Sequence, residues 1–318
     1  MFAACRLPQR SAFESPAPHV KHRKLAFGLV LAAVACGART ALIVPDHEDA
    51  SVDASPDVRD ASRDRVIDAP EEDVEFPDVP IISDCPDAGD TLIYLLGDQN
   101  ELYSFYPPTL KFRAIGTIGC EMASTPNSMA VTRSGIAFTN FHDGNMFEVS
   151  TLNAACKATP YLPNQHGWTT YGMGYANGPD GGEILYVSGS SPPAGLATVD
   201  TTTFKLGFIA NFQPPEQDIC ELTGTGAGEL FGYCPQGNNS HLIQIDPATA
   251  KVLSSHPFSF SIGNAYAFAF WGGDFWIFHG SGQSTVTKYD PVTQMESTAT
   301  TAPILVVGAG VSTCAPQK

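Results

Sequence analysis

The stretch HLIQIDPATAKV, residues His241 to Val252, decides the fold. Its first half alternates apolar and polar residues, which is the pattern of a half-buried β-strand, and it runs directly into Asp-Pro-x-Thr. An Asp side chain accepts hydrogen bonds from the main chain just ahead of it, Pro presets the next φ, and Thr closes the turn. The stretch therefore predicts a hairpin that joins two neighbouring antiparallel strands.

Related stretches recur along the chain at a nearly constant spacing. The same turn stands at Asp246 here, at Asp290 in VTKYDPVTQM and at Asp200 in LATVDTTTFK, with looser copies at Tyr106 in LYSFYPPTLK and Ser150 in MFEVSTLNAA. In chain order the copies are 44, 50, 46 and 44 residues apart. A period of roughly 40–50 residues is typical of propeller blades, each a four-stranded antiparallel sheet. We therefore predict an all-β fold: a β-propeller of five four-stranded antiparallel blades over residues 91–318.

The ends of the repeat region complement each other. The first copy, TLIYLLGDQNELYSFYPPTLKFRAIG, lacks an innermost strand, and PILVVGAGVSTC supplies one extra strand. We expect this last strand to pair beside Thr91–Leu96, which closes the ring and removes free sheet edges. A β-sandwich is the alternative, but it does not predict five similar segments. In the last full copy we predict strands at Ala265–Trp271, Asp274–His279, Ser284–Tyr289 and Gln294–Thr298.

The N-terminal region has the pattern of a secretory signal. Its parts are a basic start at Lys21, Arg23 and Lys24, an apolar core over Leu25–Val34, and Ala-Val-Ala-Cys at the cleavage position. A Cys directly after that position resembles a bacterial lipobox, with Ala33 where Leu is usual. We predict that residues 1–36 are a signal region ending at an acylated Cys36; ordinary signal-peptidase cleavage is the alternative. Because residues 1–19 fit poorly before such a signal, we hypothesise that translation starts at Val20.

The cysteine count favours acylation. With Cys36 acylated, six cysteines remain downstream: Cys85, Cys120, Cys156, Cys220, Cys234 and Cys314. Without it, an odd thiol remains in an oxidising compartment. Cys220 and Cys234 are symmetric about Ala227, so a hairpin turning there sets them opposite each other at bridging distance. Cys85 with Cys314, flanking the ring closure, and Cys120 with Cys156 are the remaining pairs we suggest, among about fifteen formal pairings.

Residues 37–90 have the composition of a disordered tether. Residues 46–90 carry 16 acidic and 3 basic side chains, and Phe76 is the one aromatic. Such a segment cannot bury enough apolar surface to offset its ordering entropy, and its charges repel one another. Its regularly spaced Asp residues suggest calcium, but the chain has no D-x-D-x-D-G loop there. We predict a solvated spacer, no bound metal, and, with a formal net charge of −16 and no basic patch, no nucleic-acid partner.

The signal, the tether and the repeated x-Φ-x-Φ-D-P-x-T pattern resemble bacterial β-propeller lipoproteins, with blades like the quinoprotein-type and surface-layer repeats. The resemblance implies an exported protein anchored to the membrane by lipid, expected at the outer membrane and facing the periplasm or the surface. We further expect a monomer without a cofactor. The blade pattern is shared by binders, scaffolds and enzymes, so it assigns no activity. The chain also contains no metalloprotease, nucleophile-elbow or phosphate-loop motif.

Candidate site residues lie in the loops expected to connect successive blades. Four of them suggest a platform on which a sugar or peptide stacks: His166, Trp168, Tyr171 and Tyr266. Packing between blades is the alternative for these rings. Four carboxylates suggest the acid–base pair of an inverting glycosidase, which requires a separation of roughly 6.5–9.5 Å: Glu121, Glu216, Asp218 and Glu221. Ordinary loop carboxylates are the alternative, and His142, His241, His256 and His279 show no shared zinc spacing.

The functional expectation is a non-catalytic binding or scaffold propeller at the cell envelope, with a carbohydrate or protein ligand over the loop face. Two alternatives stay open. One is a polysaccharide hydrolase or lyase that uses carboxylates of the channel. The other is a purely structural component of the envelope.

Overall fold

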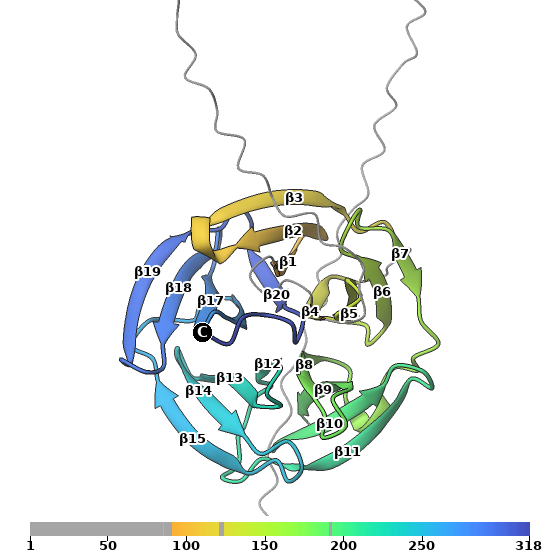
Figure 1. The fold of residues 1–318 in the computed structure, drawn as a ribbon. Helices are drawn as coiled ribbons and strands as arrows, with labels where there is room; N and C mark the ends of the chain where they lie inside the picture. Colours follow the sequence, from red (N-terminus) through yellow and green to blue (C-terminus); the bar gives the residue numbers. More distant parts are fainter. Residues whose placement is uncertain (1–84, 86–90, 121–123, 191–192) are drawn as a thin grey trace, which may run out of the picture. The chain divides into compact units, whose positions relative to one another are not determined.

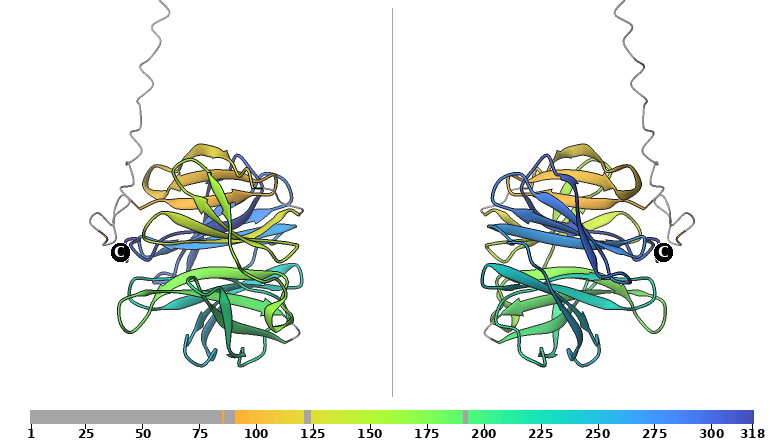
Figure 2. Two further views of the ribbon diagram at one scale, coloured as in Figure 1. Left: turned by 90° about the vertical axis from the view of Figure 1, so that its right-hand side faces the viewer. Right: turned by 90° about the vertical axis from the view of Figure 1, so that its left-hand side faces the viewer.

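The computed structural model describes Cys85 and residues 91–120, 124–190 and 193–318. The predicted signal region with Cys36, and the tether up to Cys85, lie outside the described residues. The described part forms five separate four-stranded antiparallel sheets arranged as blades around one axis (Figure 1). Side views show the same blades edge-on (Figure 2). The prediction of a five-bladed propeller is confirmed, and the β-sandwich alternative is excluded.

Each blade runs outward from an innermost strand. Blade 1 contains β20 (Val306–Gly310), β1 (Ile93–Gly97), β2 (Glu101–Tyr106) and β3 (Lys111–Thr117). Blade 2 contains β4 (Pro126–Val131), β5 (Ile136–Phe141), β6 (Met146–Ser150) and β7 (Cys156–Ala158). Blade 3 contains β8 (Tyr171–Asn177), β9 (Glu183–Ser190), β10 (Ala194–Asp200) and β11 (Lys205–Asn211). Blade 4 contains β12 (Glu221–Gly224), β13 (Leu230–Gln236), β14 (Asn239–Ile245) and β15 (Val252–Pro257). Blade 5 contains β16 (Ala265–Trp271), β17 (Asp274–Gly280), β18 (Thr285–Asp290) and β19 (Met295–Thr301).

The ring closes as the sequence predicts. The last strand, β20, pairs antiparallel with β1, and Leu95 lies opposite Ala309 while Leu96 lies opposite Gly308. Blade 1 is therefore built from both ends of the described chain, and its innermost edge is not left free. The disulfide between Cys85 and Cys314 adds a covalent link beside this closure.

The repeated turn shares one left-handed backbone position in all five blades. In the clearest copy, the Asp290 side chain accepts the main-chain N–H groups of Val292 and Thr293 at 2.8 and 3.1 Å. Four residues after each turn residue the backbone is left-handed, with φ between 56° and 59°, at Leu110, Ala154, Phe204, Ala250 and Gln294. None of these is glycine, although a left-handed conformation costs other residues about 1–2 kcal/mol. The shared conformation shows that the looser copies at Tyr106 and Ser150 belong to the same repeat.

The three cysteine pairs suggested by the sequence are the three pairs bonded in the structure. They are Cys85–Cys314, Cys120–Cys156 and Cys220–Cys234. The third follows from strand register. Glu221 lies opposite Tyr233 in the hairpin of β12 and β13. Cys220 precedes Glu221 and Cys234 follows Tyr233, so the two cysteines also lie opposite each other. Disulfides of this kind persist in oxidising compartments, which fits an exported protein.

The apolar core consists of five clusters, one between each pair of neighbouring blades. Blade 4 shows how the sequence produces this arrangement. On β13, Leu230 and Cys234 belong to the cluster shared with blade 3, whereas Tyr233 belongs to the cluster shared with blade 5. Alternate side chains of a strand point to opposite faces of its sheet. Both faces of a blade are therefore buried, and each contacts a different neighbour.

The innermost strands approach one another as closely as their backbones allow. A Cβ atom placed on Gly172 of β8 would lie 2.1 Å from the carbonyl oxygen of Cys220, next to β12. At Gly174 the corresponding distance to the backbone of Leu222 is 2.6 Å, and at Gly308 of β20 the Cβ would lie 2.9 Å from the main-chain nitrogen of Met129. Glycine is required at these positions because any side chain would push two blades apart.

The C-terminal segment that follows β20 crosses the middle of the ring (Figure 1). Thr313 binds blades 2 and 3, because its hydroxyl accepts the Arg133 Nε–H at 2.8 Å and donates to Glu183 at 2.9 Å. Further along, the Pro316 carbonyl accepts the Gly272 N–H of blade 5 at 2.8 Å. One short segment thus ties together blades that are not neighbours in the ring.

Substitution of Gly172 by Ala tests this close packing. The new methyl group would overlap main-chain atoms, which cannot rotate away, so we expect a loss of about 3 kcal/mol in unfolding free energy. Urea unfolding followed by circular dichroism measures it. Gly282→Ala is the matched control, because nothing lies within 4 Å of its Cβ position. Equal stability of the two variants would show that the innermost strands are not in backbone contact.

Candidate functional site

The loop carboxylates predicted from sequence separate into different environments, and Glu121 lies outside the described residues. The Glu216 Oε2 atom lies 3.1 Å from the Nε2 atom of His241. His241 is on β14, the third strand of blade 4, and not on the innermost strand at the axis. Glu221 lies at the start of the innermost strand β12 and accepts a hydrogen bond of 2.6 Å from Ser128 of blade 2. Asp218 is exposed in the connecting loop between them. The structure therefore brings no two of these side chains into a shared hydrogen bond or ion pair.

Glu221 is sealed inside the ring and is 6% exposed. The Ser128 hydroxyl that donates to it accepts the Met173 N–H of blade 3 at 3.1 Å, so this contact joins three blades. Burial raises the pKa of Glu221 to about 8, although the hydrogen bonds from Ser128 and Met173 lower it. The side chain is mostly protonated at neutral pH. Tyr266 lies nearby, and its own burial raises its pKa.

Two of the four predicted stacking residues are core residues. Trp168 is 2% exposed and lies against Gly189, where an added Cβ would meet the indole at 2.1 Å. Tyr171 is completely buried on β8 between blades 2 and 3. His166 is exposed and stacks on Phe208 with 4.1 Å between ring centroids.

The fourth, Tyr266, is half-buried, and its hydroxyl donates to the Ile219 carbonyl at 3.1 Å. Inter-blade packing, the alternative reading, thus describes Trp168 and Tyr171. The four rings do not form one open platform.

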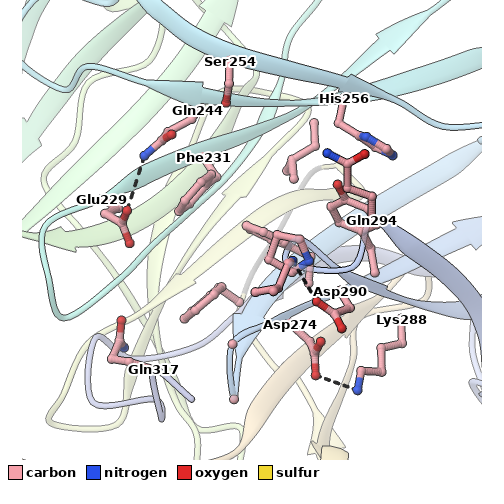
Figure 3. Close-up of a pocket in the computed structure, with 18 of the residues that line it drawn as sticks. Glu229, Phe231, Gln244, Ser254, His256, Asp274, Lys288, Asp290, Gln294 and Gln317 are labelled. Carbon is pink, nitrogen blue, oxygen red and sulfur yellow. Dashed lines mark hydrogen bonds and ion pairs between the residues drawn. The ribbon is translucent and has the colours of Figure 1, made fainter.

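A different site lies on the other side of the ring: a pocket of about 810 Å³ between blades 4 and 5, here called the blade 4–5 pocket (Figure 3). The turn between the first two strands of a blade and the turn between its last two lie at the same end, opposite the connections between blades. Gly273 and Pro291 in these two turns of blade 5 both line the pocket. It therefore opens on this turn face, together with Gln317 and Lys318 of the C-terminal segment.

Aromatic rings form a continuous cluster along the blade 4–5 pocket. Phe231 of β13 stacks on Phe270 at 6.4 Å and meets the edge of Phe275 at 4.8 Å. Phe270 and Phe275 are buried, whereas Phe231 is half-buried and lines the cavity. Tyr289 stacks on Phe275 at 6.2 Å and on His256 at 4.5 Å between centroids.

The carboxylates that line the pocket are already engaged. Asp274 forms an ion pair of 2.7 Å with Lys288, and Glu229 accepts a hydrogen bond of 3.3 Å from Gln244 (Figure 3). Asp290 holds its own turn, and the hydrogen bonds from Thr293 keep its pKa below the usual value.

Glycoside hydrolysis requires an acid and a base that are both free to transfer protons. Each of these pocket carboxylates has an intramolecular partner.

The four histidines named in the sequence analysis have separate surroundings. One of them, His241, belongs to a cluster of possible metal ligands. His142 is exposed, and His256 lies in the pocket wall. His279 is buried between Ser261 and Thr287, and burial lowers its pKa. His241, however, lies with Glu216 and Cys234 so that one potential ligand atom from each falls within 4.8 Å of the others. The expectation of scattered histidines missed this cluster because strand pairing brings His241 beside Cys234, and the loop before β12 adds Glu216.

Sequence reasoning missed the blade 4–5 pocket because it examined only the face of the connecting loops. The pocket residues come from six strands, β13 to β18, from the turns between them and from the C-terminal segment, and no motif links them. One signal was present: Gln244, Asp290 and Gln294 lie at or near the ends of Asp-Pro-x-Thr hairpins. Such hairpins place polar groups at one end of every blade.

Comparison with known proteins identifies no family. No protein-family model matches the chain, and no curated protein matches it. Among solved structures, TolB from Acinetobacter baumannii aligns over 69% of this chain and 55% of its own, with 14% identity and a TM-score of 0.43. A protein of unknown function from Bacteroides caccae aligns over 70% and 98%, with 10% identity and a TM-score of 0.39. The Dos1 propeller aligns over 62% and 52%, with 12% identity and a TM-score of 0.38.

The chain thus spans little more than half the length of TolB. At these similarities no ligand, partner or activity transfers to it. Within the described residues, no helix has the length and apolar character needed to span a bilayer.

Replacement of Glu221 by Gln tests the buried acid on the axis. The folded-state pKa of about 8 lies above the ordinary value of 4.5, so the contribution of Glu221 to stability is most favourable below about pH 4.5. This contribution falls by up to about 1.4 kcal/mol per pH unit between the ordinary and the folded-state pKa. We expect Glu221→Gln to remove this decline and to exceed the wild type in stability at alkaline pH.

Urea unfolding at acid, neutral and alkaline pH measures the effect. Glu229→Gln, which changes an exposed carboxylate, is the control and should keep the wild-type pH dependence. Parallel pH profiles for wild type and Glu221→Gln would contradict a buried, protonated Glu221.

Proposed function

We propose that this protein is a non-catalytic, glycan-binding propeller whose ligand occupies the blade 4–5 pocket. The observation that carries the proposal is the partly exposed ring of Phe231 among polar side chains in a cavity of about 810 Å³. Ligand pockets of roughly 300–1,000 Å³ with apolar walls and a few polar groups are typical of small-molecule and cofactor sites. The pocket is large enough for a short oligosaccharide segment.

The chemistry of the lining favours a neutral, hydroxyl-rich ligand. Three carboxylates and two ammonium groups line the pocket, from Glu229, Asp274, Asp290, Lys288 and Lys318, so their charges nearly cancel. The amides of Gln244, Gln294 and Gln317 add donors and acceptors for hydroxyl groups. An apolar ring face beside such groups suits the alternating C–H and O–H surface of a sugar.

The proposal places the protein at the cell envelope of a bacterium. Three disulfides in the described part support export. The lipobox-like sequence before Cys36 supports a lipid anchor, and the acidic segment that follows would hold the propeller away from the membrane as a monomer. The outer membrane is the expected location, and the ligand is then a glycan of the periplasm or the cell surface.

The alternative of a polysaccharide hydrolase or lyase receives less support. Glu216 and Glu221 have different partners, His241 and Ser128, and Glu221 is buried. A protein or peptide ligand in the same pocket is the other outcome that the experiment below distinguishes.

Glycan-array binding by the full chain tests the proposal. We expect binding to neutral glycans without their hydrolysis, and at least a tenfold weaker affinity for Phe231→Leu, which loses the ring face but keeps apolar volume. A tenfold change corresponds to about 1.4 kcal/mol. Phe208→Leu is the matched control, because Phe208 is 40% exposed on blade 3, away from the pocket. Binding only to peptides, turnover of the glycan, or equal weakening by both variants would overturn the proposal.

A further inference from the structure

A row of potential metal ligands crosses the face of blade 4 that is turned toward blade 3. Cys234 of β13 lies directly opposite His241 of β14 in the strand register. On its other side Cys234 is bonded to Cys220, with 4.2 Å between the Cα atoms. Neighbouring positions of paired strands point their side chains to the same face. The three side chains are therefore placed side by side by hairpin geometry.

Glu216 completes the row from the loop that enters blade 4. Its carbonyl oxygen accepts the Ala194 N–H of blade 3 at 2.8 Å, which fixes the backbone of the loop at this point. Its carboxylate lies 3.1 Å from His241 Nε2, and the ligand atoms of Glu216, Cys234 and His241 all fall within 4.8 Å of one another. Four residues of the donor types that zinc accepts thus meet at the boundary of two blades.

His241 carries an unusual feature. The residue is 6% exposed, and its Nδ1 atom is buried without a hydrogen-bond partner among the described residues. Buried polar atoms are almost always paired, so an exception requires an explanation. A metal-bound histidine coordinates through one ring nitrogen and is oriented through the other, often by a carboxylate. The contact of Nε2 with Glu216 leaves Nδ1 as the available nitrogen.

We propose that, when the Cys220–Cys234 disulfide is reduced, this corner of blade 4 binds one zinc-class divalent cation. A dithiol reductant supplies two electrons and two protons, so the S–S bond becomes two thiols and the reductant becomes a cyclic disulfide. The cation then displaces both thiol protons and binds the two sulfur atoms as thiolates. His241 is the third ligand, and Glu216 either completes the tetrahedron or orients the imidazole.

The geometry requires little movement. Zinc–sulfur bonds of about 2.3 Å place two thiolates about 3.7 Å apart in a tetrahedral site, which is farther apart than two bonded sulfurs. The Cα distance of 4.2 Å leaves room for this change through side-chain rotation. Oxidation reverses it, because a disulfide sulfur is no longer a thiolate ligand. The same corner can thus be closed by a metal before oxidation and by a disulfide afterwards.

Cobalt(II) titration of the full chain tests the proposal. The protein is reduced with dithiothreitol, and the reductant is then removed under anaerobic conditions. The reduced protein is compared with the oxidised protein. We expect one equivalent of cobalt to produce thiolate-to-cobalt charge transfer and the strong visible bands of tetrahedral cobalt in the reduced protein only. Zinc should abolish both signals. Absence of these signals in the reduced wild type would overturn the proposal.

Three variants assign the signal to this corner. The double substitution Cys220→Ser with Cys234→Ser keeps the other four described cysteines, and should lose the cobalt bands. His241→Asn should weaken cobalt binding about 100-fold while both thiols remain. Glu216→Gln is a milder change that keeps the loop intact, and should weaken binding about tenfold or more. Bands that persist in the double variant, or that are unchanged in both His241→Asn and Glu216→Gln, would show that cobalt binds elsewhere.

Discussion

Backbone contact between the innermost strands is the constraint on which the rest of this structure depends. Because Gly172 and Gly174 leave no room for even a methyl group against blade 4, the blades meet near the axis without an open channel between these strands. The side chains that do reach the axis, such as Ser128 and Glu221, are buried and bonded to each other. The proposed ligand site lies farther from the axis, in the pocket between blades 4 and 5.

The two faces of blade 4 carry different groups of side chains, because successive side chains of a strand point to opposite faces of its sheet. The residues turned toward blade 3 include Cys234 and His241, whereas Phe231 and Gln244 line the pocket beside blade 5. A one-residue slip in the pairing of β13 would exchange these two sets completely. The Cys220–Cys234 bond joins opposed residues and so allows only one register for the hairpin. The disulfide thereby holds the aromatic wall of the pocket in position, although it lies on the opposite face of the sheet.

The features that sequence could predict are local or periodic. Asp246 and Asp290 mark hairpins whose hydrogen bonds involve only the next three residues, so five copies suffice to reveal the blades and the closure. The pocket has no such signature, because Phe231, Tyr289 and Lys318 meet only after two blades pack. The burial of Trp168 could not be predicted from the sequence either. Trp168 lies in a polar loop, yet its indole packs on Gly189, and nothing in the sequence connects these two positions. The left-handed backbone at Ala250 and Gln294 escaped notice because neither residue is glycine.

The C-terminal segment connects ring closure to the proposed ligand site. It leaves β20, binds Arg133 and Glu183 through Thr313, and ends with Gln317 and Lys318 in the wall of the pocket. The Cys85–Cys314 disulfide attaches the same segment to the chain that precedes the propeller. Since the segment also bonds to Gly272 of blade 5, a ligand that orders this wall would in turn stabilise the contacts that hold the ring closed.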